Sequence, residues 1–290
     1  MEVKRKNIFI FKFTMKQKIN SISGVTLIEI LIGILISVIM MGAMFSTYSV
    51  VNNTYSQVSD RAKISRTGRD VLGMMMRDVR MAGYKYFGDN IQTSNLHIPI
   101  LITKSTNFNK ACDKIDIVYG DYDFNAKSNK FERYKITYEC IKSTIPDKSA
   151  PPLPGNKYPP IDAFAIYKSK VKWDTTSKAW HDPLTDNNDT TYGGQLIVDY
   201  VQDLIFNPMD ENGMLIKPPP TATNSNKDKI YKIKTVDIAL TVRSTKDFYR
   251  NSKLRKIFAL VDTTRNKQKT DKILRESIIV TAHARNLGLQ

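Results

Sequence analysis

The sequence predicts an α+β protein in which one long N-terminal helix packs on an antiparallel β-sheet. An apolar run and then an amphipathic stripe continue to about residue 82, and the first proline of the 290-residue chain is Pro99. Beyond that proline, several segments alternate apolar and polar residues, as half-buried strands do. A long helix followed by a run of strands is typical of a sheet folded onto the helix.

The first element is an apolar segment over residues 25–45, VTLIEILIGILISVIMMGAMF, whose only charged residue is Glu29. Its twenty-one residues, as a helix, span the roughly 30 Å hydrocarbon core of a bilayer. The preceding residues carry six Lys and Arg against Glu2, a net charge of +5. By the positive-inside rule, we expect the start of the chain in the cytoplasm and the rest across the membrane.

Glu29 requires a partner, because a carboxylate within a membrane costs roughly 2.5–3.5 kcal/mol on insertion scales. The small residues before the apolar segment end at Gly24. Cleavage after Gly24 would remove the basic leader and give Val25 a free α-amino group within one helical turn of Glu29. That amine could pair with Glu29 of the same chain or of a neighbouring subunit. The alternative is a tolerated glutamate near the cytoplasmic interface of a plain membrane anchor.

Residues 23–29, SGVTLIE, together with the apolar run that follows, resemble the class III signal of type IV prepilins and pseudopilins. The resemblance implies that a membrane prepilin peptidase cuts after Gly24 and N-methylates Val25. It also implies that Glu29 guides docking of the subunit into a growing filament. Val25 departs from the phenylalanine that is usual at the methylated position.

This organisation divides the chain into four parts. Residues 1–24 form a cleaved basic leader, and residues 25–45 form a transmembrane and filament-core helix. Residues 46–83 continue as an amphipathic periplasmic helix, and residues 84–290 form a globular β-rich pilin domain.

The amphipathic part of the helix is recognised by apolar residues at steps of three and four. Gly83 is the expected C-cap. The stripe consists of Tyr48, Val51, Tyr55, Val58, Ala62, Leu72, Met75, Met76 and Val79.

The residues at the end of the helix carry a more specific resemblance, to one type of minor pilin. Residues 77–84, RDVRMAGY, resemble the helix-ending motif of the PilW type of minor pilin, which shares its fold with the J-type pseudopilins of type II secretion. Two C-terminal stretches, residues 236–243 and 280–287, fit as well. Asp78 and Arg80 either pair with charges on the sheet or form a solvated helical face.

The strands are expected where apolar and polar residues alternate. Pro-rich stretches at residues 146–160 and 218–220 interrupt them and indicate surface loops. The expected strands are Ile115–Tyr119, Tyr134–Cys140, Phe164–Trp173, Leu196–Tyr200, Ile233–Val242 and Ile278–Ala284.

Cys112 and Cys140 are the only cysteines and flank a predicted β-hairpin. Outside the cytoplasm we expect them to form a disulfide, and two unpaired thiols are the alternative. On the chain-entropy model, a bridge closing a loop of this length stabilises the fold by roughly 3–4 kcal/mol.

Within that loop, five oxygen-bearing residues follow the spacing of a twelve-residue calcium loop. The sixth position is Ala126, where an EF-hand requires glycine, and the flanks are predicted strands and not helices. A polar hairpin tip is the alternative to a calcium site. Positions 1, 3, 5, 9 and 12 are Asp121, Asp123, Asn125, Asn129 and Glu132.

The net charge of +16 is concentrated in the leader and in residues 243–275, which carry eleven Lys and Arg against three Asp. Basic residues interleaved with aromatic ones can bind DNA through phosphate contacts and stacking. The alternative is a solvated connection between the last two strands. The candidate nucleic-acid residues are Arg250, Lys253, Arg255 and Lys256.

No enzyme signature is present in the sequence: there is no Gly-rich phosphate loop, no HExxH and no GxSxG. Together with the resemblance, this absence leads us to expect a non-enzymatic minor pilin that needs no cofactor and is processed by prepilin peptidase. The resemblance implies partners in other minor pilins, the major pilin and the inner-membrane assembly platform. It places the chain in the inner membrane first and then in a cell-surface pilus. The alternatives are a J-type pseudopilin of type II secretion and a DNA-binding receptor pilin.

Overall fold

The structure is a computed structural model that describes residues 24–84, 98–105, 112–122, 131–148, 150–181, 191–221, 227–257 and 265–287. The chain forms two compact units, Met1–Tyr55 and Ser56–Gln290. The helix contributes its first part to one unit and its second part to the other. Among the described residues, every buried side chain belongs to the Ser56–Gln290 unit.

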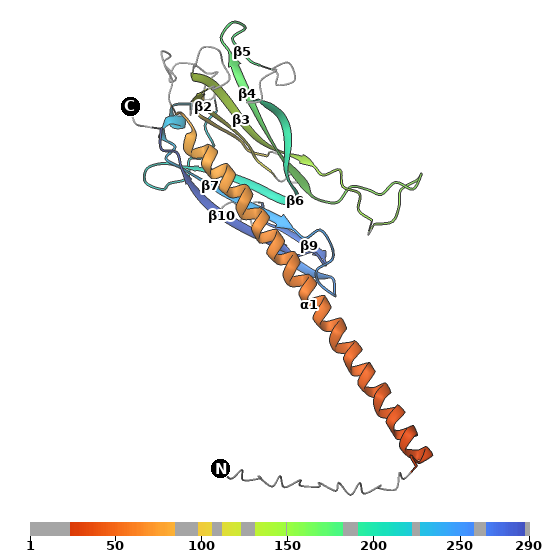
Figure 1. Cartoon of the computed structure of the whole chain (residues 1–290). Helices are drawn as coiled ribbons and strands as arrows, with labels where there is room; N and C mark the ends of the chain where they lie inside the picture. The colour runs from red at the N-terminus through yellow and green to blue at the C-terminus, as the bar shows by residue number, and fades with distance from the viewer. Residues whose placement is uncertain are drawn as a thin grey trace, which may run out of the picture. The chain divides into compact units, whose positions relative to one another are not determined.

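Helix α1 runs from Leu27 to Met81, which confirms the predicted unbroken helix (Figure 1). None of its four internal glycines interrupts the helical conformation. Gly83 follows with a φ of 71°, the left-handed conformation expected of a C-cap. Its N–H donates a hydrogen bond to the carbonyl of Val118 at 2.9 Å, which ties the end of the helix to the sheet.

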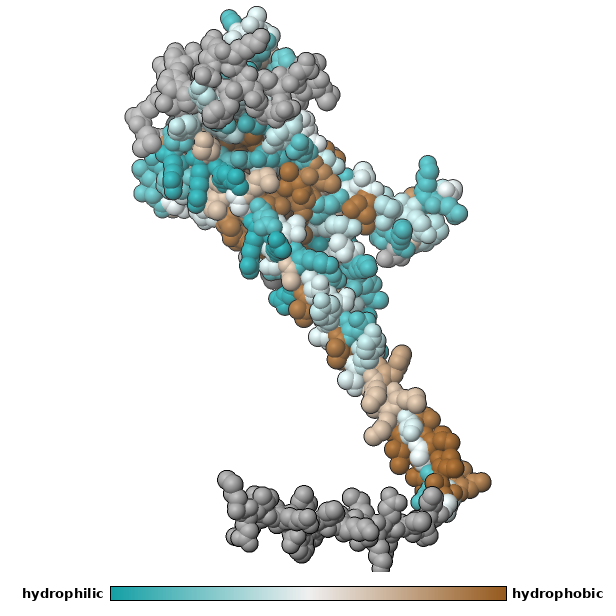
Figure 2. Space-filling view, in the orientation of Figure 1, coloured by the Kyte–Doolittle hydropathy of each residue, from teal (hydrophilic) through white to brown (hydrophobic). Residues whose placement is uncertain are grey.

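The first unit contains the apolar part of α1. Its large hydrophobic side chains are exposed, and Figure 2 shows them as a continuous hydrophobic surface along this part of the helix. Within the described residues, α1 is the one helix that is long and apolar enough to cross a membrane, judged by length and composition. The two halves of the amphipathic stripe differ in burial: Tyr48, Val51 and Tyr55 are exposed, and the first buried residue of the helix is Ile64.

The second unit is built on an antiparallel sheet in the order β1-β2-β3-β4-β6-β7-β10, with β5 paired to β4 and a separate β8–β9 hairpin. The strands are β1 (Ile100–Thr103), β2 (Lys114–Tyr122), β3 (Phe131–Lys142), β4 (Phe164–Asp174), β5 (Ala179–Trp180), β6 (Tyr192–Met209), β7 (Thr235–Arg243), β8 (Lys253–Ile257), β9 (Lys267–Asp271) and β10 (Arg275–His283). A 3-10 helix, Lys227–Lys232, precedes β7.

All six predicted strands are present, so the α+β prediction is confirmed. The sequence pattern missed β1, β5, β8 and β9. Strands β8 and β9 read KLRKI and KQKTD, and such charged segments show little apolar alternation. Residues 243–275 were expected either to bind DNA or to form a solvated connection between the last two strands, and within this stretch residues 253–257 pair with residues 267–271 as a hairpin.

The core lies between the second half of α1 and one face of the sheet. Leu72, Met75 and Val79 are fully buried there, and each such side chain contributes about 1.5–3 kcal/mol by leaving water. The neighbouring Met74 and Met76 are partly buried against the same cluster, so the methionine run is core packing, as predicted.

Gly68 allows close contact between α1 and the last strand of the sheet. A Cβ atom at this position would lie 2.6 Å from Cδ1 of Ile278 and 3.8 Å from Cγ2 of Val242. Gly73, on the same helix, has no atom within 4 Å of a Cβ built in the same way. Two glycines five residues apart therefore differ in whether the fold requires them.

The substitution Gly68→Val should lower the free energy of unfolding by about 2 kcal/mol, because it forces added methyl groups between α1 and β10. Gly73→Val serves as the matched control and should change it by no more than about 0.5 kcal/mol. Urea unfolding of both variants of the Ser56–Gln290 unit, followed by circular dichroism, gives the comparison. Equal losses in the two variants would contradict the close approach at Gly68.

Candidate functional site

The start of α1 is a reciprocal capping box between Thr26 and Glu29. The Thr26 backbone N–H and the Thr26 hydroxyl both donate to Oε2 of Glu29 at 3.0 Å. In return, the Glu29 N–H donates to Oγ1 of Thr26 at 3.4 Å. Such a box satisfies backbone donors that an α-helix leaves free in its first turn. The sequence analysis missed Thr26, although the T-x-x-E spacing before an apolar run is the known sequence sign of this cap.

The capping box defines the conformation of the predicted cleavage site. Gly24, Val25 and Thr26 have no helical assignment, so the Gly24–Val25 peptide bond lies just outside the helix. Both residues are exposed in the described chain. A peptidase must accommodate a scissile bond in its own binding groove, and a bond outside the helical hydrogen-bond ladder can be bound without unwinding α1.

The same geometry would place the α-amine of Val25, which the predicted cleavage creates, close to the Glu29 carboxylate. The backbone nitrogen of Thr26 is already 3.0 Å from the Glu29 carboxylate, and Val25 is the adjacent residue. In the uncleaved chain, the carboxylate accepts hydrogen bonds from Thr26 alone among the described residues. Cleavage would add a positively charged donor one residue away from this cap.

At the other end of the helix, Asp78 joins α1 to the sheet. Its carboxylate accepts a hydrogen bond from the Tyr138 hydroxyl at 2.5 Å and lies 2.7 Å from Nζ of Lys168. Burial and the adjacent Asp78 carboxylate both raise the pKa of Tyr138, so the phenol remains a donor. The expected pairing with sheet charges is therefore confirmed for Asp78. Arg80 is exposed and contacts the sulfur of Met76 in its own helix.

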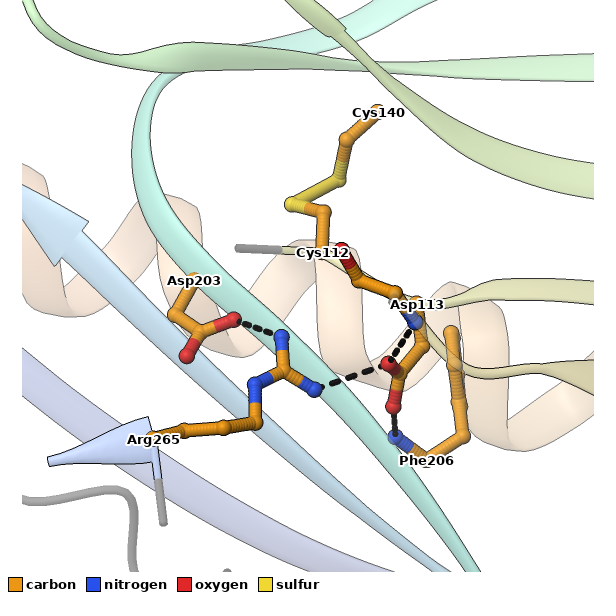
Figure 3. Close-up of a disulfide and its surroundings, with 7 residues drawn as sticks. Cys112, Asp113, Cys140, Asp203, Phe206 and Arg265 are labelled. Atoms are coloured by element: carbon orange, nitrogen blue, oxygen red, sulfur yellow. Dashed lines mark hydrogen bonds and ion pairs between the residues drawn. A yellow bond between two sulfur atoms is a disulfide. The ribbon is translucent and has the colours of Figure 1, made fainter. Parts of the chain in front are cut away.

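The disulfide is present between Cys112 and Cys140, with the two Cα atoms 5.8 Å apart (Figure 3). It joins the residues that precede β2 to the C-terminal end of β3, across the hairpin that the sequence predicted. The prediction of a bridge is confirmed.

Next to the bridge, Asp113 is the centre of a buried ionic cluster. Its side chain has no solvent exposure, and Arg265 lies 2.7 Å from one carboxylate oxygen (Figure 3). The same guanidinium lies 2.5 Å from Asp203 of β6. The other Asp113 oxygen accepts the Phe206 N–H at 3.0 Å and lies 2.9 Å from Nζ of Lys104.

This cluster holds together segments that lie far apart in the sequence. Arg265 precedes β9, so its two ion pairs attach the β8–β9 hairpin to β6 and to the start of β2. Burial raises the pKa of Asp203, and the guanidinium opposes that shift. The sequence analysis counted Arg265 only as one charge of a basic stretch. Nothing local marks it, because its partners are 62 and 152 residues away in the sequence.

Two members of the predicted calcium loop are described, and both pair with lysines of β4. Asp121 lies 3.6 Å from Lys170, and Glu132 lies 3.3 Å from Lys172. The other three members, Asp123, Asn125 and Asn129, lie outside the described residues. Within the described ranges, no three His, Cys, Asp or Glu residues are grouped as metal ligands would be. Calcium binding by this loop stays a prediction.

The four candidate nucleic-acid residues do not share one face. Lys253 and Arg255 alternate with Lys256 along β8, so they lie on opposite sides of the hairpin. Arg255 lies over the Tyr249 ring, 3.7 Å from its centroid, and donates to the backbone carbonyls of Lys253 and Asp271. Tyr249 is thus already stacked on a side chain of the protein. Arg250 is exposed in the loop before β8.

No protein-family model matches the chain, and no curated protein matches it. Among solved structures, a type IV-like pilin from Thermus thermophilus is similar, with a TM-score of 0.47 and 9% sequence identity. The match covers 77% of this chain and 96% of that chain.

Replacing Arg265 by methionine should destabilise the protein by about 3–5 kcal/mol, because Asp203 would remain buried without its ion-pair partner and Asp113 would keep only Lys104. Lys272→Met is the control, since Lys272 lies 3.7 Å from Asp247 in a pair whose side chains are 42% and 55% exposed. That substitution should cost no more than about 0.5 kcal/mol. The measurement is urea unfolding of the oxidised Ser56–Gln290 unit. A loss in Arg265→Met as small as in the control would rule out a structural role for the cluster.

Proposed function

We propose that this chain is a prepilin that becomes a filament subunit after cleavage between Gly24 and Val25. One observation carries the proposal: the last five residues of the SGVTLIE motif begin a 21-residue apolar segment whose only charged residue is Glu29, and α1 begins within them at Leu27. A cleavage site before the apolar segment removes only the basic leader. The mature chain therefore keeps its membrane-spanning helix, which can later leave the bilayer for a filament core.

Glu29 and the new amine supply the docking interaction in this proposal. While the leader is attached, Thr26 satisfies the Glu29 carboxylate through the capping box. After cleavage, the charged amine of Val25 competes for the same carboxylate, from the same chain or from a neighbouring subunit. In a low-dielectric filament core, such a pair favours the register in which both charges are matched. N-methylation of Val25 leaves that amine charged.

Within the class, we propose a minor pilin of the PilW type that takes part in a priming or tip complex. The RDVRMAGY motif supports this assignment, and its Asp78 connects α1 to the sheet. The partners would be other minor pilins, the major pilin and the inner-membrane assembly platform. Retention of Glu29 favours a position below another subunit, because a terminal cap has no subunit above it to engage. In this proposal the prepilin peptidase catalyses the reaction, and this protein is its substrate.

Mass spectrometry of the mature protein tests the processing step. We expect a chain that begins at Val25 and carries one added methyl group on its α-amine. In a strain without prepilin peptidase, the leader should remain attached. An intact leader in the presence of an active peptidase would contradict the proposal.

The substitution Glu29→Ala separates processing from assembly. Cleavage and methylation should persist, because the residues at the scissile bond are unchanged, while incorporation into filaments should fall at least tenfold. Ser37→Ala is the control, because the Ser37 hydroxyl lies in the same apolar segment and donates to the Gly33 carbonyl of its own helix at 2.7 Å. Quantitative immunoblots of sheared filaments and of membranes measure both steps. Normal incorporation of Glu29→Ala would overturn the docking role.

A further inference from the structure

The β8–β9 hairpin and the loop before it carry cations that have no counter-ion among the described residues. The acidic residues beside them are already neutralised: Asp247 lies 3.7 Å from Lys272, and Asp271 lies 2.5 Å from Arg275. Among the residues that the structure describes, no acidic side chain pairs with the remaining cations of this surface. The exposed cations are Lys246, Arg250, Lys253 and Lys256.

The hairpin has an inner face that packs on the protein and an outer face that does not. On the inner face, Arg255 lies over the Tyr249 ring and Lys269 pairs with Asp162. The outer face is exposed along both strands and contains no acidic residue; it consists of Leu254, Lys256, Gln268 and Thr270. Leu254 is 63% exposed, so a large apolar side chain projects between basic ones.

This surface is connected to the helix soon after the apolar segment ends. Nε2 of Gln57 donates a hydrogen bond to the carbonyl of Phe248, in the loop that leads to β8, at 3.0 Å. Gln57 follows Phe45, the last residue of the apolar segment, by twelve residues. Such a connection reaches about 18 Å as a helix and no more than about 40 Å when fully extended. The length of the covalent chain therefore limits the distance between Gln57 and a membrane that holds residues 25–45 to about 40 Å.

We propose that the outer face of the β8–β9 hairpin, together with the exposed Arg250 in the loop before β8, binds the anionic phospholipid surface of the membrane from which the subunit is assembled. The proposal rests on the membrane insertion of residues 25–45 that belongs to the proposed function. Basic residues near an anionic bilayer surface are attracted to its headgroups, and an exposed leucine adds apolar burial at the headgroup boundary.

The same observations favour a lipid surface over a nucleic acid. Nucleic-acid binding of this kind uses free aromatic rings as stacking platforms, whereas the Tyr249 ring is occupied by Arg255. An exposed leucine next to basic residues matches the boundary between the headgroups and the acyl chains of a bilayer. The hairpin also holds its cations on a paired backbone, so little conformational entropy is lost when it binds.

Vesicle cosedimentation of the Ser56–Gln290 unit tests this binding, because that unit contains every buried side chain of the described chain. It should bind vesicles that contain about 30% phosphatidylglycerol, which gives an anionic surface, and this binding should weaken as the salt concentration rises. It should not bind vesicles of pure phosphatidylcholine. The double variant Arg250→Glu/Lys256→Glu should bind at least tenfold more weakly. Leu254→Ser should bind several-fold more weakly and keep the salt dependence.

The matched control is Lys148→Glu/Lys157→Glu, which changes the net charge equally on the exposed Pro-rich loop. It should bind within twofold of the unchanged protein. Equal weakening in the two double variants, or equal binding to neutral vesicles, would show a non-specific charge effect and overturn the proposal. Tighter binding to duplex DNA than to vesicles at matched phosphate concentration would assign the surface to nucleic acid and also overturn it.

The full chain provides a second measurement that does not depend on how the isolated unit folds. A bimane group on Leu254→Cys, in full-length protein reconstituted in nanodiscs, should be quenched by headgroup spin labels more strongly with phosphatidylglycerol than without it. Equal quenching in both nanodiscs contradicts lipid binding by the hairpin. A failed proposed function would appear separately, as a leader that prepilin peptidase does not remove.

Discussion

The Ser56–Gln290 unit depends on the packing of the second half of α1 against one face of the sheet. Leu72, Met75 and Val79 supply buried apolar surface, and Gly68 lets the helix approach Ile278 without a side chain between them. The first half of the same helix has no comparable partner within the described chain. One continuous element therefore has two different apolar surfaces, one used by this chain and one available to a bilayer or to other subunits.

Buried carboxylates then determine how the remaining parts attach to this layer. Asp78 connects α1 to β3 and β4 through Tyr138 and Lys168. Asp113, next to the disulfide, connects the start of β2 to β6 and, through Arg265, to the β8–β9 hairpin. A buried carboxylate is costly unless it is paired, so each of these contacts is specific for one arrangement of the strands. The basic hairpin keeps its place because Arg265 and Lys269 turn inward, which leaves other cations for the outside.

Sequence patterns were sufficient where the physical rule is local. The length of α1 followed from an uninterrupted periodic pattern without proline, and its end followed from Gly83. The central strands followed from alternation, because one face of each is buried. The charged strands β8 and β9 could not be found in this way. Their inner faces are satisfied by Tyr249 and Asp162, which lie outside the two strands, and not by apolar packing. The Thr26 cap depends on a local rule as well, because the T-x-x-E spacing of Thr26 and Glu29 indicates it in the sequence.

The sequence alone determined the features that depend on neighbouring residues: the apolar segment, the basic leader, the motif around Gly24 and Glu29, and the α+β class. The tertiary structure alone decided how distant charges are used. Arg265 lies 152 residues from Asp113 and 62 from Asp203, and pairing at that separation depends on the path of the whole chain. The structure likewise separated Arg255, which faces the protein, from Lys256, which faces solvent. The reason is that the two sides of a strand alternate, and only strand pairing shows which side is covered.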